Sequence, residues 1–403
     1  MKNKLPERWK EVELFRYLEL ASSGVKRFSG IKKYVDTGSL ETGKIKDFVD
    51  VNYKDRPSRA NMEVKDGDVL FAKMKDTEKI YLVSKEDANH LYSTGFAVLR
   101  IKDNSKLISK YIYFWLRTEN FQKLKNRECT GATQKAIGET KLRKFRIVVP
   151  PLGTQKQIVS ILEKAEKAKE WRKEADKLTN DFLKSVFMEM FGDPVKNTKR
   201  WDIETIENLV KKTKYSIKRG PFGGALKKEI FVNKGYLVYE QFHALNNDFN
   251  FGRYFIDDKK FQELKAFEVF PEDIIISCSG IYLGKLAIVP KEAKRGIINQ
   301  ALLKISLDKN KYNNVFFTYV FRSENFRNTF FGDDRGSGIP NFPPMPTFKQ
   351  FKFITPPIEL QNQFFSIVKE VEHMKEQQKH SKENIDNLFN VLMQKAFKGE
   401  LVV

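Results

Sequence analysis

Two segments of the chain carry apolar side chains at alternating steps of three and four residues, which is the spacing of one face of an α-helix. The first segment runs from Ile158 to Val186 and the second from Phe364 to Leu392, with each position 206 residues after its counterpart. Lys and Glu fill many of the other positions. A heptad pattern kept in phase over four repeats predicts two long helices that supercoil against a partner, and the simplest partner for each helix is the other.

Antiparallel pairing with matched ends would place Arg172 opposite Gln378, where a polar layer fixes register at some expense in stability. A helix over the 29 residues from Ile158 to Val186 is about 43 Å long at 1.5 Å per residue. The alternative is that each helix packs only on its own globular domain. The residues predicted to form the coiled coil are Ile158, Ala165, Arg172, Phe182, Val186, Phe364, Val371, Gln378, Ile385 and Leu388.

The sequence before each long helix mixes short strand-like runs with loops. Runs such as Val69–Phe71 and Leu286–Val289 have the size of strands and are bounded by Gly, Asp, Asn and Lys. Residues 109–126 and 313–331 are predicted to be helical. Each half is therefore predicted to begin with a domain that contains both helices and strands.

The two halves repeat one another in order and in residue type, which indicates a tandem duplication. The string LRTENF at 116–121 recurs as FRSENF at 321–326, and the Pro-Pro pair at 150–151 recurs at 356–357, each followed by two glutamines. The change of pattern at the Pro-Pro pairs sets the boundaries: an αβ domain at 1–150, a helix at 151–193, an αβ domain at 194–355 and a helix at 356–403. The predicted fold class is α+β, with two tandem αβ domains separated by two long helices that form an antiparallel coiled coil with pseudo-two-fold symmetry.

The charge balance points to a polyanionic partner. The 403 residues contain 73 Lys and Arg against 52 Asp and Glu, a formal net charge of +21. Neutralising phosphates releases condensed counterions and so gives affinity for nucleic acid without special geometry. A hydrophobic content of 41% excludes wholesale disorder. The beginning of the chain lacks a signal peptide and no run of about 18 apolar residues occurs, so we expect a cytoplasmic protein without membrane contact.

The usual motifs for catalysis are missing. The chain has no phosphate-binding GxxxxGK[ST] loop and no Asn or Asp followed by Pro-Pro and an aromatic residue, as in amino-methyltransferases. Two cysteines and four histidines leave little material for a disulfide framework or a zinc site. A magnesium-dependent nuclease site can be drawn through Asp273, Glu292 and Lys294, but the first half has Ala88 in place of that lysine. We therefore expect a non-catalytic chain that holds no metal and no cofactor.

Basic and aromatic residues cluster on predicted loops in both halves, for example at 32–34, at Lys73 with Lys75, and at Lys218 with Arg219. The glycine-rich stretch 220–224 predicts a loop whose backbone can approach a ligand, or a tight turn. Phosphate contacts position a protein on duplex DNA, whereas sequence is read by side chains that reach base edges. The clusters therefore predict DNA binding.

The overall pattern resembles the specificity subunit of type I restriction-modification systems. The resemblance rests on tandem αβ domains that are each followed by Pro-Pro-(Leu/Ile)-x-x-Gln-x-Gln and a long heptad helix. The strings at 187–194, 220–227, 271–280 and 299–302 are also similar to that family. The resemblance covers essentially the whole chain and is weakest in the first αβ domain.

This resemblance implies that each αβ domain is a target recognition domain for one half of a split site in double-stranded DNA. It implies two methyltransferase subunits docked on the helices, together with restriction/motor subunits. S-adenosylmethionine, ATP and magnesium would then be bound by those partners. A helix of about 43 Å spans roughly 12 to 13 base pairs at 3.4 Å each, which suits a site with an unread spacer.

We interpret the chain as a non-catalytic DNA reader and scaffold. One alternative is the specificity portion of a single-chain restriction-modification enzyme, and another is a DNA-binding scaffold without sequence choice. The residues predicted to contact DNA are Lys32, Lys33, Tyr34, Lys73, Lys75, Lys218, Arg219, Phe222, Lys227, Lys228, Ser277 and Ser279.

Overall fold

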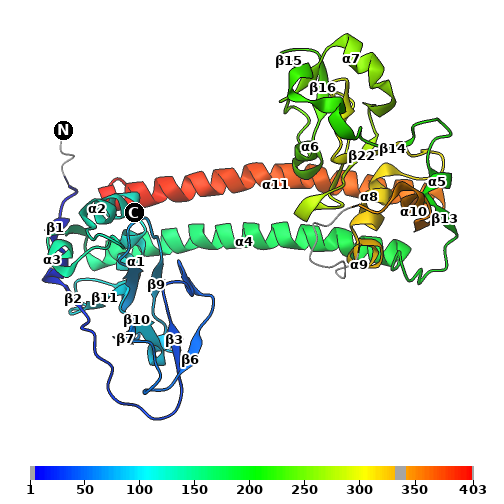
Figure 1. Cartoon of the computed structure of the whole chain (residues 1–403). Coiled ribbons are helices and arrows are strands. Elements are labelled where there is room, and N and C mark those ends of the chain that lie inside the picture. The colour runs from blue at the N-terminus through cyan, green and yellow to red at the C-terminus, as the bar shows by residue number, and fades with distance from the viewer. Residues whose placement is uncertain (1–4, 332–341, 402–403) are drawn as a thin grey trace. The chain divides into compact units, whose positions relative to one another are not determined.

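The computed structural model describes residues 5–331 and 342–401 and divides into two compact units (Figure 1). Unit 1 takes in the chain up to Glu174 and from Gln378 onward, and unit 2 takes in Ala175–Gln377. Each unit contains one αβ domain, part of the first long helix and part of the second. Among the residues that the structure describes, none of the helices is long and apolar enough to cross a lipid bilayer.

Unit 1 is built on small sheets of short strands. One sheet has the order β2 (Leu18–Leu20), β11 (Phe96–Ile101), β8 (Val69–Ala72) and β9 (Ile80–Leu82). Another has the order β6 (Val49–Val51), β3 (Lys32–Val35), β10 (Leu91–Ser93) and β7 (Ala60–Glu63). Further pairs join β1 (Lys10–Glu13) to β12 (Arg146–Val149) and β4 (Leu40–Glu41) to β5 (Lys44–Ile45). β3 and β10 are parallel, whereas the other pairs are antiparallel.

Unit 2 repeats this frame, which confirms the predicted duplication. One sheet has the order β14 (Ile217–Arg219), β22 (Leu302–Ile305), β19 (Ile274–Ser277) and β20 (Leu286–Ile288). Another has the order β15 (Phe231–Val232), β17 (Phe255–Ile256), β16 (Tyr236–Tyr239), β21 (Gly296–Ile298) and β18 (Glu268–Val269). β13 (Ile203–Thr205) pairs with β23 (Lys352–Ile354). Again a parallel pair, β16 with β21, lies in the middle of the second sheet.

Short helices cover the sheets, and two of the predicted helical regions are each divided into two helices by a break of one or two residues. Residues 109–126 form α1 (Ser109–Leu116) and α2 (Glu119–Glu128), because Thr118 caps α2 by accepting a hydrogen bond from the Phe121 amide. The second copy breaks at Ser323, whose hydroxyl accepts from Phe326 N between α8 (Asn314–Arg322) and α9 (Glu324–Phe331). The other short helices are α3 (Glu139–Leu142), α5 (Ile206–Leu209), α6 (Gln241–Asn246), α7 (Asp258–Glu263) and α10 (Met345–Lys349).

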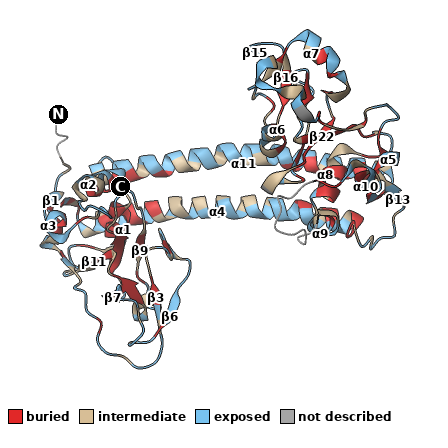
Figure 2. Cartoon of the chain, viewed as in Figure 1, coloured by how far each residue is buried: buried red, intermediate tan, exposed pale blue. Residues whose placement is uncertain are grey.

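The long helices are α4 (Leu152–Phe191) and α11 (Ile358–Lys398), and they pair antiparallel as predicted. In unit 1 the beginning of α4, at Ile158, shares a core with Met393 near the end of α11. In unit 2 the relation is reversed, because Phe187 near the end of α4 packs against Phe364 near the beginning of α11, with ring centroids 5.5 Å apart. Figure 2 shows that both helices are buried mainly toward their ends and exposed or half-buried between them. The ends also pack on the αβ domains, so the helices do not simply contact one another.

Two of the predicted coiled-coil positions were wrong. Phe182 is 50% exposed and Leu388 is 55% exposed, while their neighbours Leu183 and Phe389 are buried. The buried face shifts by one residue because each helix end packs on a domain core as well as on the other helix, which a strict heptad does not anticipate. Of the remaining positions, those that are buried or half-buried are Ile158, Ala165, Arg172, Val186, Phe364, Val371, Gln378 and Ile385. The polar layer of Arg172 and Gln378 stays a prediction.

The first glutamine of the repeated Pro-Pro motif has a structural role, because its side chain makes buried hydrogen bonds. Gln155 is fully buried, and its Nε2 donates to the carbonyls of Lys106 (2.8 Å) and Pro150 (2.9 Å) while its Oε1 accepts from Ile108 N (3.1 Å). Gln361 repeats this arrangement with the carbonyls of Lys311 and Pro356 and the amide of Asn313. Each glutamine therefore ties the first turn of a long helix to the loop before the short helices.

Replacing Gln155 or Gln361 by Leu is expected to lower the free energy of unfolding by about 2–4 kcal/mol, because buried backbone groups lose their partners. Chemical denaturation measures the change. Gln157→Leu and Gln363→Leu are matched controls, since these second glutamines of the motif are exposed. Equal stability of the buried-site and exposed-site variants would contradict this role.

Candidate nucleic-acid interface

In unit 2 the ends of β14, β16, β19 and β21 meet at one place between the sheets. The amide of Asn299, after β21, donates to the carbonyl of Tyr239, the last residue of β16 (2.9 Å). The Nε2 atom of Gln241 bridges from the end of β16 to Ser277, the last residue of β19 (2.9 Å). We define the strand-end junction of unit 2 as Arg219–Gly220, Glu240–Gln241, Cys278–Ser279 and Asn299–Gln300.

Gly220 allows the junction to close. A Cβ atom at this position would lie 1.8 Å from the carbonyl oxygen of Asn299, far inside van der Waals contact. The Gly220 amide also donates to the carbonyl of Leu302 (2.8 Å). At Gly220 the glycine-rich loop therefore permits close approach of the chain's own backbone, and approach of the loop to a ligand stays a prediction.

The side chain of Gln241 is held in one orientation. Its Nε2 donates to the Ser277 hydroxyl and to the Ser279 carbonyl, both at 2.9 Å. Gln241 begins α6, whose N-terminus is closed by reciprocal hydrogen bonds between Glu240 and the buried His243. The backbone and the amide of Gln241 are thus both fixed before any ligand arrives.

Arg219 contributes a positive charge to the same junction. Its guanidinium lies 5.1 Å from the ring of Phe222, which is 69% exposed. Burial raises the pKa of the Cys278 thiol to about 12, with the charge of Arg219 acting against that rise, so Cys278 is a neutral neighbour of the guanidinium. Phe242 and Tyr282, which follow Gln241 and Ser279 closely in the chain, are also exposed aromatic residues. The junction therefore combines a cation, a fixed amide and exposed rings.

Unit 1 has the same junction with different side chains. The amide of Lys73, after β8, donates to the carbonyl of Gly95 (3.0 Å), and Lys79 Nζ donates to the carbonyl of Thr37 after β3. Thr37 takes the place of Gln241, and Lys73 takes the place of Cys278. Burial, with a contribution from the nearby charge of Arg59, lowers the pKa of Lys73. The backbone frame is shared, whereas the chemistry that it presents differs.

The predicted DNA-contacting residues fall into two groups. Tyr34 and Ser277 are buried, so their prediction as DNA contacts was wrong: Tyr34 packs in a core with Val51 and Leu91, and the Ser277 hydroxyl is occupied by Gln241. The others are exposed or half-buried and stay predictions: Lys32, Lys33, Lys73, Lys75, Lys218, Arg219, Phe222, Lys227, Lys228 and Ser279. Lys33 and Lys32 lie over the rings of Phe48 (3.9 Å) and Phe28 (5.1 Å), at the beginning of β3, whereas Thr37 follows its end.

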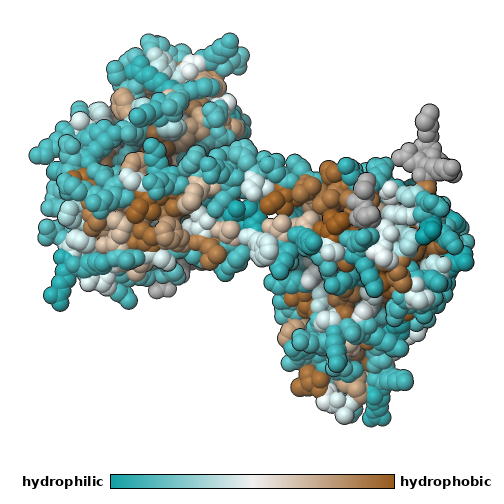
Figure 3. Space-filling model, turned by 180° about the vertical axis from the view of Figure 1, so that it is seen from behind, coloured by the Kyte–Doolittle hydropathy of each residue, from teal (hydrophilic) through white to brown (hydrophobic). Residues whose placement is uncertain are grey.

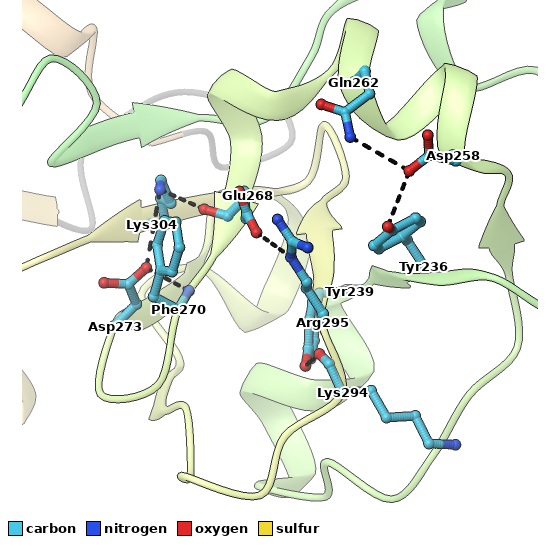
Figure 4. Close-up of polar contacts among 10 residues, drawn as sticks. All are labelled: Tyr236, Tyr239, Asp258, Gln262, Glu268, Phe270, Asp273, Lys294, Arg295 and Lys304. Atoms are coloured by element: carbon cyan, nitrogen blue, oxygen red, sulfur yellow. Dashed lines mark hydrogen bonds and ion pairs between the residues drawn. The ribbon is translucent and has the colours of Figure 1, made fainter.

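The nuclease geometry considered from the sequence does not form. Asp273 is buried and accepts from the Ser306 hydroxyl and the Phe270 amide, and its carboxylate lies 3.9 Å from Lys304 Nζ. Figure 4 shows Lys304 between Asp273 and the Glu268 carbonyl, while the Lys294 side chain extends away from that cluster. Within the described part of the chain, no group of three or more His, Cys, Asp or Glu side chains could hold a metal ion.

Gln241, Glu240 and Asn299 were missed by sequence reasoning. Glu240 and Asn299 each follow a strand directly and Gln241 comes one residue later, but residues 240–295 separate the two strands, β16 and β21, and nothing local in the sequence says that their ends coincide. The available signal was weak: a polar residue directly after each short apolar run.

Comparison with known proteins covers both units. A family model described as the type I restriction modification DNA specificity domain matches residues 19–180 and 195–387. A solved chain from a study of the structural basis of complex assembly and conformational transition of the type I R-M system is 18% identical, with a TM-score of 0.69, and the match covers 99% of this chain and 100% of that one.

Two crystal structures of single subunits have a similar fold. The HsdS subunit from Thermoanaerobacter tengcongensis is 18% identical with a TM-score of 0.50, covering 99% of this chain and 98% of that one. The type I restriction-modification S subunit from M. genitalium is 14% identical with a TM-score of 0.53, covering 98% and 97%.

Proposed function

This chain belongs to the type I restriction modification DNA specificity family, and from that premise we propose that each of its two units reads one half of a split site in duplex DNA. The observation that carries the proposal is the repeated strand frame with unlike side chains at its strand ends. By strand register, Arg219 and Gln241 of unit 2 correspond to Ser22 and Thr37 of unit 1. Different donor and acceptor sets read different base edges, so two unlike junctions suit two unlike half-sites.

Exposed lysines near each junction supply the sequence-independent part of binding. Lys75 follows β8 in unit 1, and Lys227 and Lys228 follow the Gly220 loop in unit 2. Contacts from these side chains to phosphates would position each unit without reading sequence. The overall charge of +21 supports this assignment, and binding is expected to weaken steeply as salt increases.

We infer that the long helices are the docking surface for two methyltransferase subunits, one for each unit, and that restriction/motor subunits join that complex. Within unit 2, Leu178 and Phe182 of α4 and Met374 of α11 are large apolar side chains exposed to solvent. Hydrophobic patches are also visible on the surface in Figure 3. Apolar exposure of this kind on a helix supports a protein partner.

In this proposal the chain is non-catalytic and binds no cofactor itself. S-adenosylmethionine, ATP and magnesium would be bound by the methyltransferase and motor subunits. We place the complex in the cytoplasm, where it meets host and incoming DNA. The carboxylate Asp273 and the thiol Cys278, which are reactive groups elsewhere, are buried here and engaged in structural contacts.

Exchange of residues 194–355 for the corresponding domain of a family member with another target is the direct test. The hybrid, assembled with its methyltransferase, is expected to methylate a site in which one half changes while the other half and the spacer length stay the same. Sequencing of methylated DNA gives the motif, with the unaltered chain as control. A continuous, unsplit motif would refute the two-reader proposal, and binding that ignores sequence would favour a general DNA-binding scaffold.

A further inference from the structure

Hydrogen bonding fixes which end of the Gln241 amide faces outward. The Ser279 carbonyl can only accept, so the group that contacts it at 2.9 Å must be the NH₂ of Gln241. The same NH₂ reaches the hydroxyls of Ser277 (2.9 Å) and Ser279 (3.3 Å). The amide oxygen therefore points away from these serines, and within the described residues it accepts no hydrogen bond. Gln241 presents an acceptor whose orientation is already set.

The guanidinium of Arg219 provides hydrogen-bond donors at the same strand-end junction. Arg219 ends β14, and the next residue, Gly220, packs closely against the Asn299 carbonyl. The Asn299 amide in turn donates to the carbonyl of Tyr239, two residues before Gln241. Within the described residues the Nε atom of Arg219 is buried and makes no hydrogen bond. A buried guanidinium nitrogen without an acceptor costs free energy, and an acceptor supplied by a ligand would satisfy it.

We propose that the strand-end junction of unit 2 is its base-reading site, in which the Gln241 carbonyl selects a base with an exocyclic amine on its major-groove edge and Arg219 selects guanine. This inference rests on the proposed function and names the bases that the second unit can accept. In the major groove adenine N6 and cytosine N4 are donors, whereas guanine O6 and thymine O4 are acceptors that would oppose the Gln241 oxygen. Guanine offers N7 and O6 together, the acceptor pair that suits a guanidinium.

The corresponding junction of unit 1 cannot recognise the same two bases. Thr37 stands at the position of Gln241 and Ser22 at the position of Arg219, so neither the fixed carbonyl nor the guanidinium is present. The cations there are Lys73, with Arg59 nearby, and Lys79, which donates to the Thr37 carbonyl. The half-site of unit 1 therefore serves as an internal reference for any change made in unit 2.

The test uses the full chain, assembled with its methyltransferase subunits, carrying Gln241→Leu. One position of the unit 2 half-site, occupied by adenine or cytosine in the unaltered motif, is expected to lose discrimination by roughly 10- to 100-fold. Arg219→Lys keeps the charge but loses the bidentate fork, and it is expected to relax a guanine position to a similar extent. Sequencing of methylated DNA reads out both changes.

Gln262→Leu is the matched control, because Gln262 is an exposed glutamine of α7 in the same unit whose side-chain amide donates to Asp258 (Figure 4). If Gln241→Leu prevents folding, as judged by hydrogen exchange, Arg219→Lys still decides the matter. An unchanged unit 2 half-site in the variants, or relaxation at a position that held guanine or thymine for Gln241, would overturn the inference while leaving a split motif intact. Loss of the split motif in the unaltered complex would instead count against the proposed function.

Discussion

Asp273→Ala is expected to lower the free energy of unfolding of unit 2 by about 3–5 kcal/mol, because it leaves a buried ammonium without its counter-charge. The side chains of Asp273 and Lys304 are 1% and 4% exposed, and their charged atoms lie 3.9 Å apart. Burial raises the pKa of Asp273 and lowers the pKa of Lys304. The Asp273 carboxylate also accepts from the Ser306 hydroxyl and from the Phe270 amide, and both donors would lose their partner.

Chemical denaturation combined with hydrogen exchange of the β19 and β22 peptides measures this loss. The double variant Asp273→Leu with Lys304→Met is expected to recover most of the stability, because an apolar pair of similar volume leaves no buried charge. The neighbouring ion pair of Glu272 with Lys309 is exposed, so Glu272→Ala should change stability by less than about 1 kcal/mol. An Asp273→Ala effect no larger than that of Glu272→Ala would show that the buried pair contributes little.

The sequence revealed half of this arrangement. The segment GDVL at 67–70 is similar to EDII at 272–275, which matches Asp68 with Asp273, but the similarity does not show what either aspartate does. In unit 1 Asp68 accepts two hydrogen bonds from Arg100 (2.9 and 2.7 Å), on the strand that neighbours its own. In unit 2 Ser306 stands at the register position of Arg100 and donates to Asp273, while the cation near Asp273 is Lys304, two residues earlier on the same strand. Strand partners separated by about 30 residues leave no local pattern. The sequence therefore showed that the aspartate is repeated, but not which side chain it contacts.

The helical part of the fold was the most predictable. Heptad spacing and the Pro-Pro pairs predicted two long helices in antiparallel pairing, because the apolar residues of an amphipathic helix recur in the sequence with the period of the helix. The same spacing placed Phe182 and Leu388 in the interface, where the structure buries Leu183 and Phe389 instead. A helix of 3.6 residues per turn that packs on two different surfaces does not keep one seam, and only the tertiary structure decides between adjacent apolar residues.

The candidate site was less predictable because it depends on topology. Basic clusters such as Lys227 with Lys228 are adjacent in the chain and easily noticed. Arg219, Gln241 and Ser279 come together only because the strands that precede them end at one place. Their spacing along the chain matches no motif. The sequence alone therefore could not predict that these three residues form the proposed base-reading site.

Gly220→Ala is expected to impair base discrimination by unit 2 over its whole half-site. The added Cβ would lie 1.8 Å from the Asn299 carbonyl oxygen. Neither the Cβ nor the backbone carbonyl can rotate away, so a strand end must shift. Overpacking of this kind lowers stability by about 1–3 kcal/mol. Displacement of β14 moves Arg219 away from Gln241, and discrimination throughout the unit 2 half-site should fall by at least roughly 10- to 100-fold. Methylated-motif sequencing is expected to show a degraded unit 2 half-site beside an intact unit 1 half-site.

Gly224→Ala separates this effect from a general intolerance of the loop. A Cβ at Gly224 meets only the flexible end of the Lys227 side chain, 2.6 Å away at Cε, which can move aside. That variant should keep the motif and the stability of the unaltered chain. If Gly220→Ala behaved in the same way, closure of the strand-end junction would not be required for reading, and Arg219 and Gln241 would have to act independently of one another. If both variants lost only overall affinity, with no change of motif, the loop would contact the phosphate backbone, and its glycines would not support base recognition.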